Sequence, residues 1–83
     1  MYQLVYYYRE TTGSEVIERE YHNYEFRLRR NALHFLREII QSEYRENEYG
    51  TEQMVGGINC YKSEKTNNGD RKIIEITIKV EKV

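Results

Sequence analysis

YEFRLRRNALHFLREIIQSEYRE, from Tyr24 to Glu46, decides the fold, because it is the only long segment with a helical repeat. At about 100° per residue, its apolar side chains gather within an arc of roughly 180°. Each large apolar side chain contributes roughly 1.5–3 kcal/mol when fully buried, so we expect this helix to pack deeply against another element. The residues on the predicted buried arc are Leu28, Ala32, Leu33, Phe35, Leu36, Ile39, Ile40 and Tyr44.

The ends of this helix are less sharply marked than its centre. We predict a helix over 24–47, with Asn23 as N-cap and Gly50 as the stop after its C-terminus. Apolar and charged residues also alternate over 24–29, which is a strand pattern. A helix that begins at Asn31 is therefore the alternative.

Two further segments, on either side of the helix, have hairpin patterns. Residues 2–21 read as two strands joined at Thr12-Gly13, which pairs Tyr8 with Ile17. Residues 53–82 read as a second hairpin, in which alternate positions of the last strand are apolar. Gly56-Gly57 interrupts its first strand and indicates a bulge or a close approach of the helix, with a ligand contact as the minor alternative.

The register of the second hairpin follows from its turn residues. A three-residue loop, Asn67-Asn68-Gly69, puts a glycine where the backbone must be left-handed. It also places the apolar residues of both strands on one face, whereas a slip by one residue would turn them to water. The predicted pairs are Ile58 with Ile78 and Cys60 with Ile76.

These elements predict an α+β fold of order ββαββ, with a four-stranded antiparallel sheet and one central helix packed on one face. Eighty-three residues are expected to form a single domain, 1–83, with hairpin 2–21, helix 24–47 and hairpin 53–82. One helix cannot cover both faces of the sheet, so the far face should be solvated or used by a partner. The residues expected there are Val5, Tyr7, Val55, Tyr61, Glu18, Glu20, Glu75, Thr77 and Lys79.

Composition narrows the functional classes. The net charge of −1 does not favour general binding of polyanions, and nine tyrosines supply side chains that are enriched at interfaces. The single cysteine, Cys60, cannot form an internal disulfide, so we expect a reducing, cytoplasmic compartment. Neither a signal peptide nor an apolar run long enough to span a membrane is present, so no membrane partner is expected.

No catalytic, cofactor or metal motif is found, so we do not expect an enzyme. His34 lies one helical turn before Glu38, a spacing common on solvated helices, and His22 is distant in sequence. Cys60 falls on the predicted buried face, where thiols are usually inert. No phosphate-binding glycine loop and no zinc-ligand spacing occur.

Two charged surfaces remain as candidate binding sites. An acidic, tyrosine-bearing helix end is the candidate protein-interaction site, and it comprises Glu43, Tyr44, Glu46, Glu48, Tyr49 and Glu52. The uncovered sheet face, with Val5, Tyr7 and Tyr61, is a second candidate for protein binding. A basic ridge on the outer side of the helix is the alternative, an anion-binding surface of Arg30, His34, Arg37 and Arg45. Arg29 projects into the apolar arc and has no assigned role.

The leading hypothesis is a small non-enzymatic protein that binds a host protein stoichiometrically. In size and composition, though in no motif, the chain resembles small proteins of phages and mobile elements, which include anti-CRISPR inhibitors of host defence. Carboxylates at the helix end could stand in for phosphates in a basic, nucleic-acid-binding partner. The alternative is a protein that binds nucleic acid or a nucleotide signal through the basic ridge, and a homodimer is compatible with either.

Overall fold

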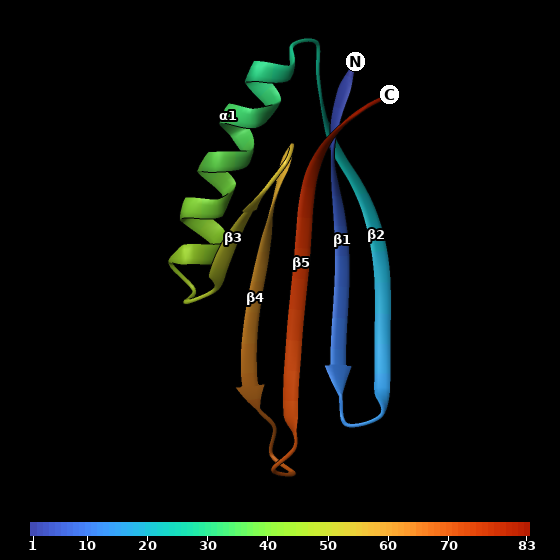
Figure 1. The fold of residues 1–83 in the computed structure, drawn as a ribbon, viewed down its shortest axis with the longest axis vertical. Coiled ribbons are helices and arrows are strands. Elements are labelled where there is room, and N and C mark those ends of the chain that lie inside the picture. The colour runs from blue at the N-terminus through green and yellow to red at the C-terminus, as the bar shows by residue number, and fades with distance from the viewer.

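The computed structural model describes residues 1–83 and shows one five-stranded antiparallel sheet with a helical segment on one side (Figure 1). The strands lie in the order β2-β1-β5-β4-β3, so β5 is central and β2 and β3 are the edges. The predicted four-stranded ββαββ fold is therefore wrong, because the chain runs ββαβββ. The elements are β1 (Tyr2–Thr12), β2 (Glu15–Phe26), α1 (Arg29–Ile39), η1 (Ile40–Arg45), β3 (Gly50–Met54), β4 (Gly57–Lys65) and β5 (Arg71–Lys82).

The fifth strand arises because the predicted strand at the start of hairpin 53–82 is two strands. Met54 pairs with Gly57 across a two-residue turn, and Gly56 in this turn has a φ of 72°. Gly57 serves a different purpose, since a Cβ there would lie 2.5 Å from the carbonyl oxygen of Ile78. The first glycine therefore permits the turn and the second permits close contact with β5, so the predicted bulge is wrong.

The helix begins later than the predicted start at residue 24. Residues 24–26 belong to β2, and α1 begins at Arg29 after an extended Leu28, close to the alternative start at Asn31. Tyr24 has a φ of 63° and lies beside an irregularity in the pairing of β1 with β2. This irregularity lets Phe26 turn toward the helix, where its ring centroid is 5.4 Å from that of Phe35.

The helix also ends earlier than predicted. Its last six residues form the π-helical segment η1, and the Tyr49 amide then donates to the Tyr44 carbonyl at 2.9 Å. Glu48, with a φ of 66°, is the left-handed residue that reverses the chain. Gly50 is not the stop but the first residue of β3, where a Cβ would lie 2.3 Å from the Tyr61 ring. Gly50 is thus needed for the aromatic ring that lies over it.

The structure confirms the predicted register of the second hairpin but not that of the first. The pairs Ile58 with Ile78 and Cys60 with Ile76 are confirmed, and Gly69 has the left-handed φ of 88° that the three-residue loop requires. In the first hairpin the turn lies at Gly13-Ser14 instead of Thr12-Gly13, so Tyr8 pairs with Arg19 and not with Ile17. This slip of two residues leaves each side chain on its predicted face.

The core lies between the helix and one face of the sheet. Its centre is Ile78 of β5, which is completely buried and is flanked in the sheet by Tyr6 and Ile58. Leu36 and Ile40 are the most buried large residues of the helical segment. The buried cluster consists of Leu4, Ala32, Leu36, Ile39, Ile40, Ile58, Cys60, Ile74, Ile76 and Ile78. All of its strand residues occupy alternate positions, so the opposite face has no helix against it.

Candidate binding surfaces

The uncovered sheet face is ordered into rows that run across the strands. Following the registers, Glu18, Arg9, Glu75 and Tyr61 lie side by side, and Glu20, Tyr7, Thr77, Asn59 and Glu52 form the next row. Four of these nine side chains are carboxylates and one is a guanidinium, so the two rows carry net negative charge. The whole chain carries a net charge of only −1, so acidity is concentrated here.

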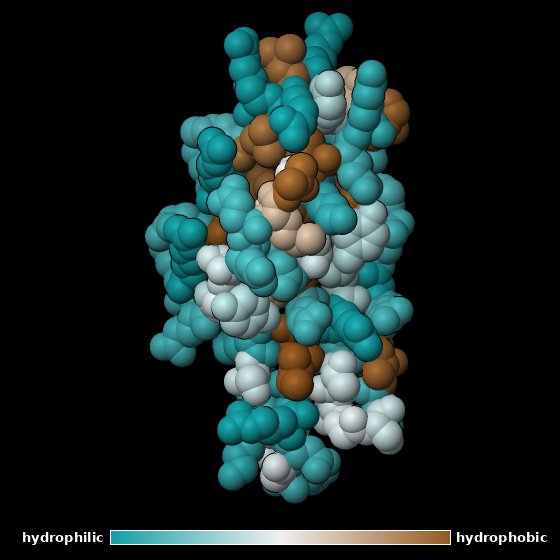
Figure 2. All heavy atoms as spheres, in the orientation of Figure 1, coloured by the Kyte–Doolittle hydropathy of each residue, from teal (hydrophilic) through white to brown (hydrophobic).

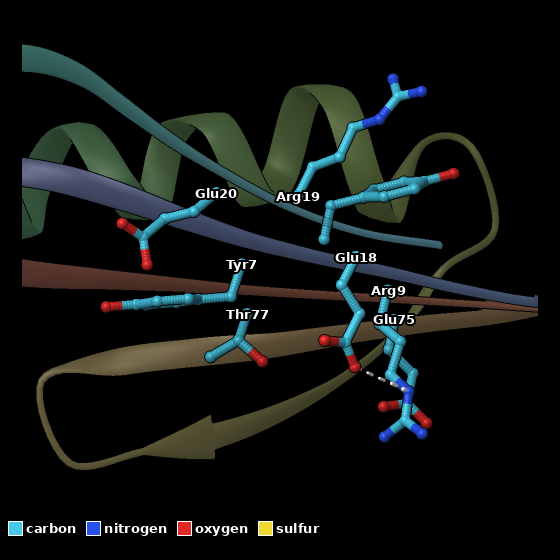
Figure 3. A pocket seen from close by; sticks show the side chains of 8 residues that line it. Tyr7, Arg9, Glu18, Arg19, Glu20, Glu75 and Thr77 are labelled. Atoms are coloured by element: carbon cyan, nitrogen blue, oxygen red, sulfur yellow. Dashed lines mark ion pairs between the residues drawn. The ribbon is translucent and has the colours of Figure 1, made fainter. Parts of the chain in front are cut away.

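A depression of about 470 Å³ lies in these rows, and we call it the acidic depression. Tyr7, Glu20 and Thr77 project to the same side of the sheet, whereas Arg19 turns to the other side (Figure 3). Arg9 and Glu18 form an ion pair across it at 3.6 Å. It is lined by Tyr7, Tyr8, Arg9, Glu18, Arg19, Glu20, Glu75 and Thr77.

The tyrosine of this depression is held in place. The Tyr7 hydroxyl donates to Glu81 at 3.1 Å, and the Lys79 ammonium lies 5.9 Å from the centre of its ring. Desolvation, followed by the hydrogen bond to Glu81, raises the pKa of Tyr7 above its ordinary value of 10.0. Thr77 is similarly fixed, because its hydroxyl donates to Asn59 at 2.9 Å. The floor of the depression thus carries two polar side chains that are hydrogen-bonded within the sheet, Tyr7 and Thr77.

The other residues predicted on this face differ in accessibility. Val5 lies on the face but is only 1% exposed, so it cannot offer a contact. Tyr61 lies on the face, covers Gly50 and is 47% exposed. Val55 is placed wrongly by the prediction, because it lies fully exposed in the turn between β3 and β4.

The structure separates the residues of the predicted acidic helix end. Tyr44 and Tyr49 contact each other, with ring centroids 5.2 Å apart, and both pack against the core. Tyr44 is half-buried, and burial is the largest cause of its raised pKa. Glu52 lies on the uncovered sheet face, so the exposed acids left at the helix end are Glu43, Glu46 and Glu48.

The predicted basic ridge also divides into two parts. His34 is paired with Glu38 at 3.1 Å, and Arg30 lies near it on the exposed side of the helix. Arg37 and Arg45 instead line a groove between the helix and β3. Arg29, to which the sequence assigned no role, lies at the end of the same groove beside Gly56.

Sequence reasoning missed Gln53 and Arg29 of the groove. Strand alternation puts Arg9 on the same face as Tyr7, but the sequence assigned it no binding role in the acidic depression. Arg29 was already conspicuous in the apolar arc, and a helix start at residue 29 explains its position at the end of the groove. No sequence signal placed Gln53 opposite the helix, because the fifth strand was not predicted.

Cys60 and the two histidines are not brought together. Cys60 is buried, and desolvation raises the pKa of its thiol to about 11. His22 contacts Glu20 at 2.7 Å on the uncovered face, far in sequence and structure from His34 on the helix. No group of three His, Cys, Asp or Glu side chains is placed to hold a metal ion.

Apolar side chains reach the surface in small groups surrounded by hydrophilic ones in the view of Figure 2. Neither α1 nor η1 has the length and apolar character that a helix needs to cross a membrane. No family model and no curated protein matches the chain.

Proposed function

We propose that this protein is a non-enzymatic binding module that docks a basic surface of a partner protein on its uncovered sheet face. The observation that carries this proposal is the acidic depression, where three carboxylates and one guanidinium surround a fixed tyrosine ring. The proposal moves the main contact from the helix end to the sheet, since Tyr44 and Tyr49 are packed inward.

The carboxylates of the depression are available to a partner. Arg9 and Glu18 are 56% and 69% exposed, and exposed pairs of this kind contribute only about 0–1 kcal/mol. Glu75 forms no ion pair, and Glu20 contacts only a histidine. A partner arginine or lysine would therefore meet one unpaired acid, Glu75, and two exposed acids whose pairing within the chain is weak.

The shape of the site favours a planar cation. A guanidinium can donate two parallel hydrogen bonds to the oxygens of a carboxylate and can lie on an aromatic ring. Glu18 and Glu20 project from the same side of β2 about 7 Å apart, and Glu75 lies two strands away at a spacing of about 4.8 Å per strand. The paired strands fix the backbone positions of these glutamates, so binding has to order only their exposed side chains.

This chemistry supports the inhibitory role expected from the sequence. A basic groove that binds nucleic acid presents arginines and lysines to phosphates, and a rigid array of carboxylates competes for the same cations. Stoichiometric occupation of such a groove would block the partner's own ligand. The phage or mobile-element setting, in which the partner is a host defence protein, remains part of this proposal.

Charge reversal on the sheet tests the proposal. The probe is a fluorescein-labelled nine-residue arginine peptide, and binding is followed by anisotropy at 50 and 200 mM NaCl. We expect Glu18→Lys/Glu75→Lys to weaken binding at least tenfold. Glu46→Lys/Glu48→Lys makes the same change in net charge at the helix end and should weaken it less than threefold.

Two outcomes would overturn the proposal. Equal losses in both variants would show that the peptide senses only net charge, and a larger loss in the helix-end variant would return the site to Glu46 and Glu48. Circular dichroism melting of each variant shows whether the fold is intact.

Nucleic-acid binding through the arginines of the helix is the second candidate. It is favoured by one observation, namely that Arg37 and Arg45 form no ion pair. It predicts that a fifteen-nucleotide oligothymidine binds at 50 mM NaCl and loses affinity steeply as salt rises. No binding at low salt would remove this candidate.

A further inference from the structure

A groove between the helix and the edge strand β3 offers a second binding surface, separate from the acidic depression. It consists of two adjoining cavities of about 160 and 290 Å³, which share Arg37, Gln53 and Ile58. The groove exists because β3 contributes only the polar Thr51 and Gln53 to the helix side of the sheet. No large apolar side chain from β3 therefore fills the space beneath the helix.

The groove has an apolar floor and a basic rim. Leu36, Ile40 and Ile58 are buried at its base, and no acidic residue lines either cavity. Arg29, Arg37 and Arg45 stand along it without ion pairs, and Arg45 donates only to the Gln41 side chain at 3.3 Å. The two outer arginines are sixteen positions apart in the chain, about 24 Å at the helical rise.

A free strand edge runs beside this groove. β3 is the last strand of the sheet and pairs only with β4. The backbone hydrogen bonds outside the regular elements include none from residues 50–54. An edge strand next to a helix is the arrangement in which an extended peptide adds to a sheet, with backbone hydrogen bonds for affinity and side-chain pockets for specificity.

We propose that this groove binds an extended peptide segment, added beside β3 as a sixth strand, in which the residues that face the helix are alternately acidic and apolar. Apolar side chains of the segment would enter over Leu36 and Ile58, and its carboxylates would meet the guanidinium groups on the rim. The groove contains no aromatic side chain on which a nucleic-acid base could stack. This argues for a peptide over single-stranded nucleic acid as the occupant.

The probe is a fluorescein-labelled octapeptide, Thr-Glu-Thr-Val-Thr-Glu-Thr-Val, whose glutamates and valines lie on one face of an extended strand. Its binding is titrated by anisotropy in 50 mM NaCl. Arg37→Glu/Arg45→Glu should weaken binding at least tenfold. The matched control is Arg27→Glu/Arg30→Glu, which changes the net charge equally outside the groove and should weaken it less than threefold. Arg37→Gln/Arg45→Gln should also lose most of the affinity. Because this variant removes the two charges without adding carboxylates, it separates loss of the arginines from misfolding caused by added acids.

Strand addition can be tested separately, by methylating backbone amides of the peptide. Successive residues of a strand direct their amide groups to opposite edges, so methylating the amides of every second residue blocks one edge only. One of the two possible methylated peptides should therefore lose binding while the other retains it, and amide resonances of residues 50–54 should shift on binding.

The proposal is overturned if the octapeptide fails to bind, or if both double reversals weaken it equally. Equal effects of the two methylated peptides would refute strand addition. If the oligothymidine binds more tightly than the octapeptide and depends on Arg37 and Arg45, the occupant is nucleic acid instead.

Discussion

Ile78 and Ile73 lie on the same strand but face opposite sides of the sheet, and this contrast permits a sharp test of the fold. Ile78 has no exposed surface and lies in β5 between Tyr6 and Ile58, beneath the helix. Ile73 is 44% exposed on the uncovered face. Replacing each with alanine removes the same atoms from two different environments.

The expected difference is large. A buried isoleucine replaced by alanine costs about 2–5 kcal/mol, because transfer free energy is lost and a cavity remains. A domain of 83 residues is stable by about 4–12 kcal/mol, at about 0.05–0.15 kcal/mol per residue. Ile78→Ala should therefore remove a large fraction of the stability and lower Tm by at least about 8 °C. Ile73→Ala should cost less than about 1 kcal/mol.

Urea unfolding followed by circular dichroism measures both variants against the parent chain. The slope of the unfolding free energy with urea should stay unchanged, so that the midpoint reports stability alone. The reasoning is refuted if Ile73→Ala costs as much as Ile78→Ala. That result would mean that both faces of the sheet are covered.

Gly57→Ala should cost about 1–3 kcal/mol in the same assay, because its Cβ would meet the Ile78 carbonyl at 2.5 Å. Loss of less than about 0.5 kcal/mol, the range of an ordinary surface substitution, would contradict the close strand contact. Stability should also fall as pH rises from 9 to 11, since burial raises the pKa of Cys60 from 9.0 to about 11 and the unfolded chain loses this proton first. In Cys60→Val this decline should be smaller, and an equal decline would assign it to other groups such as Tyr6, whose pKa is raised to about 12.

The parts of the fold that were predicted correctly depend on strong local patterns. In β5, four apolar residues alternate with polar ones, and the left-handed requirement at Gly69 then left one register for the hairpin with β4. The apolar arc of the helix likewise identified Leu36, Ile39 and Ile40 as buried. For the hairpin the apolar pattern and the turn chemistry agree, whereas for the helix the apolar pattern was right and the predicted end residues were not.

The parts that were not predicted depend on contacts between distant residues. Tyr24 adopts a positive φ, which is unusual for a tyrosine, and no local rule marks the strand irregularity there. Glu48, and not the nearby Gly50, takes the left-handed position after the helix. Gly50 is instead required by the ring of Tyr61, eleven positions later. Only the assembled sheet shows this requirement.

Of the candidate surfaces, most of the predicted sheet face lies together in the structure, whereas the acidic helix end does not. Alternation along the strands placed Tyr7, Glu18, Glu20 and Glu75 together on the uncovered face, because a two-residue slip in register does not change faces. The acidic helix end was inferred from nearness in sequence alone. It was dispersed because Tyr44 and Tyr49 pack on the core, and because β3 carries Glu52 to the other side of the sheet.

The most direct test of a cation-binding sheet face is a nuclear magnetic resonance titration of the ¹⁵N-labelled chain with the nine-residue arginine peptide. The largest amide shifts should fall on residues 7–9, 18–20 and 75–77, which lie side by side in β1, β2 and β5. Shifts confined to residues 43–48 at the helix end, or spread evenly over all exposed acids, would contradict the account.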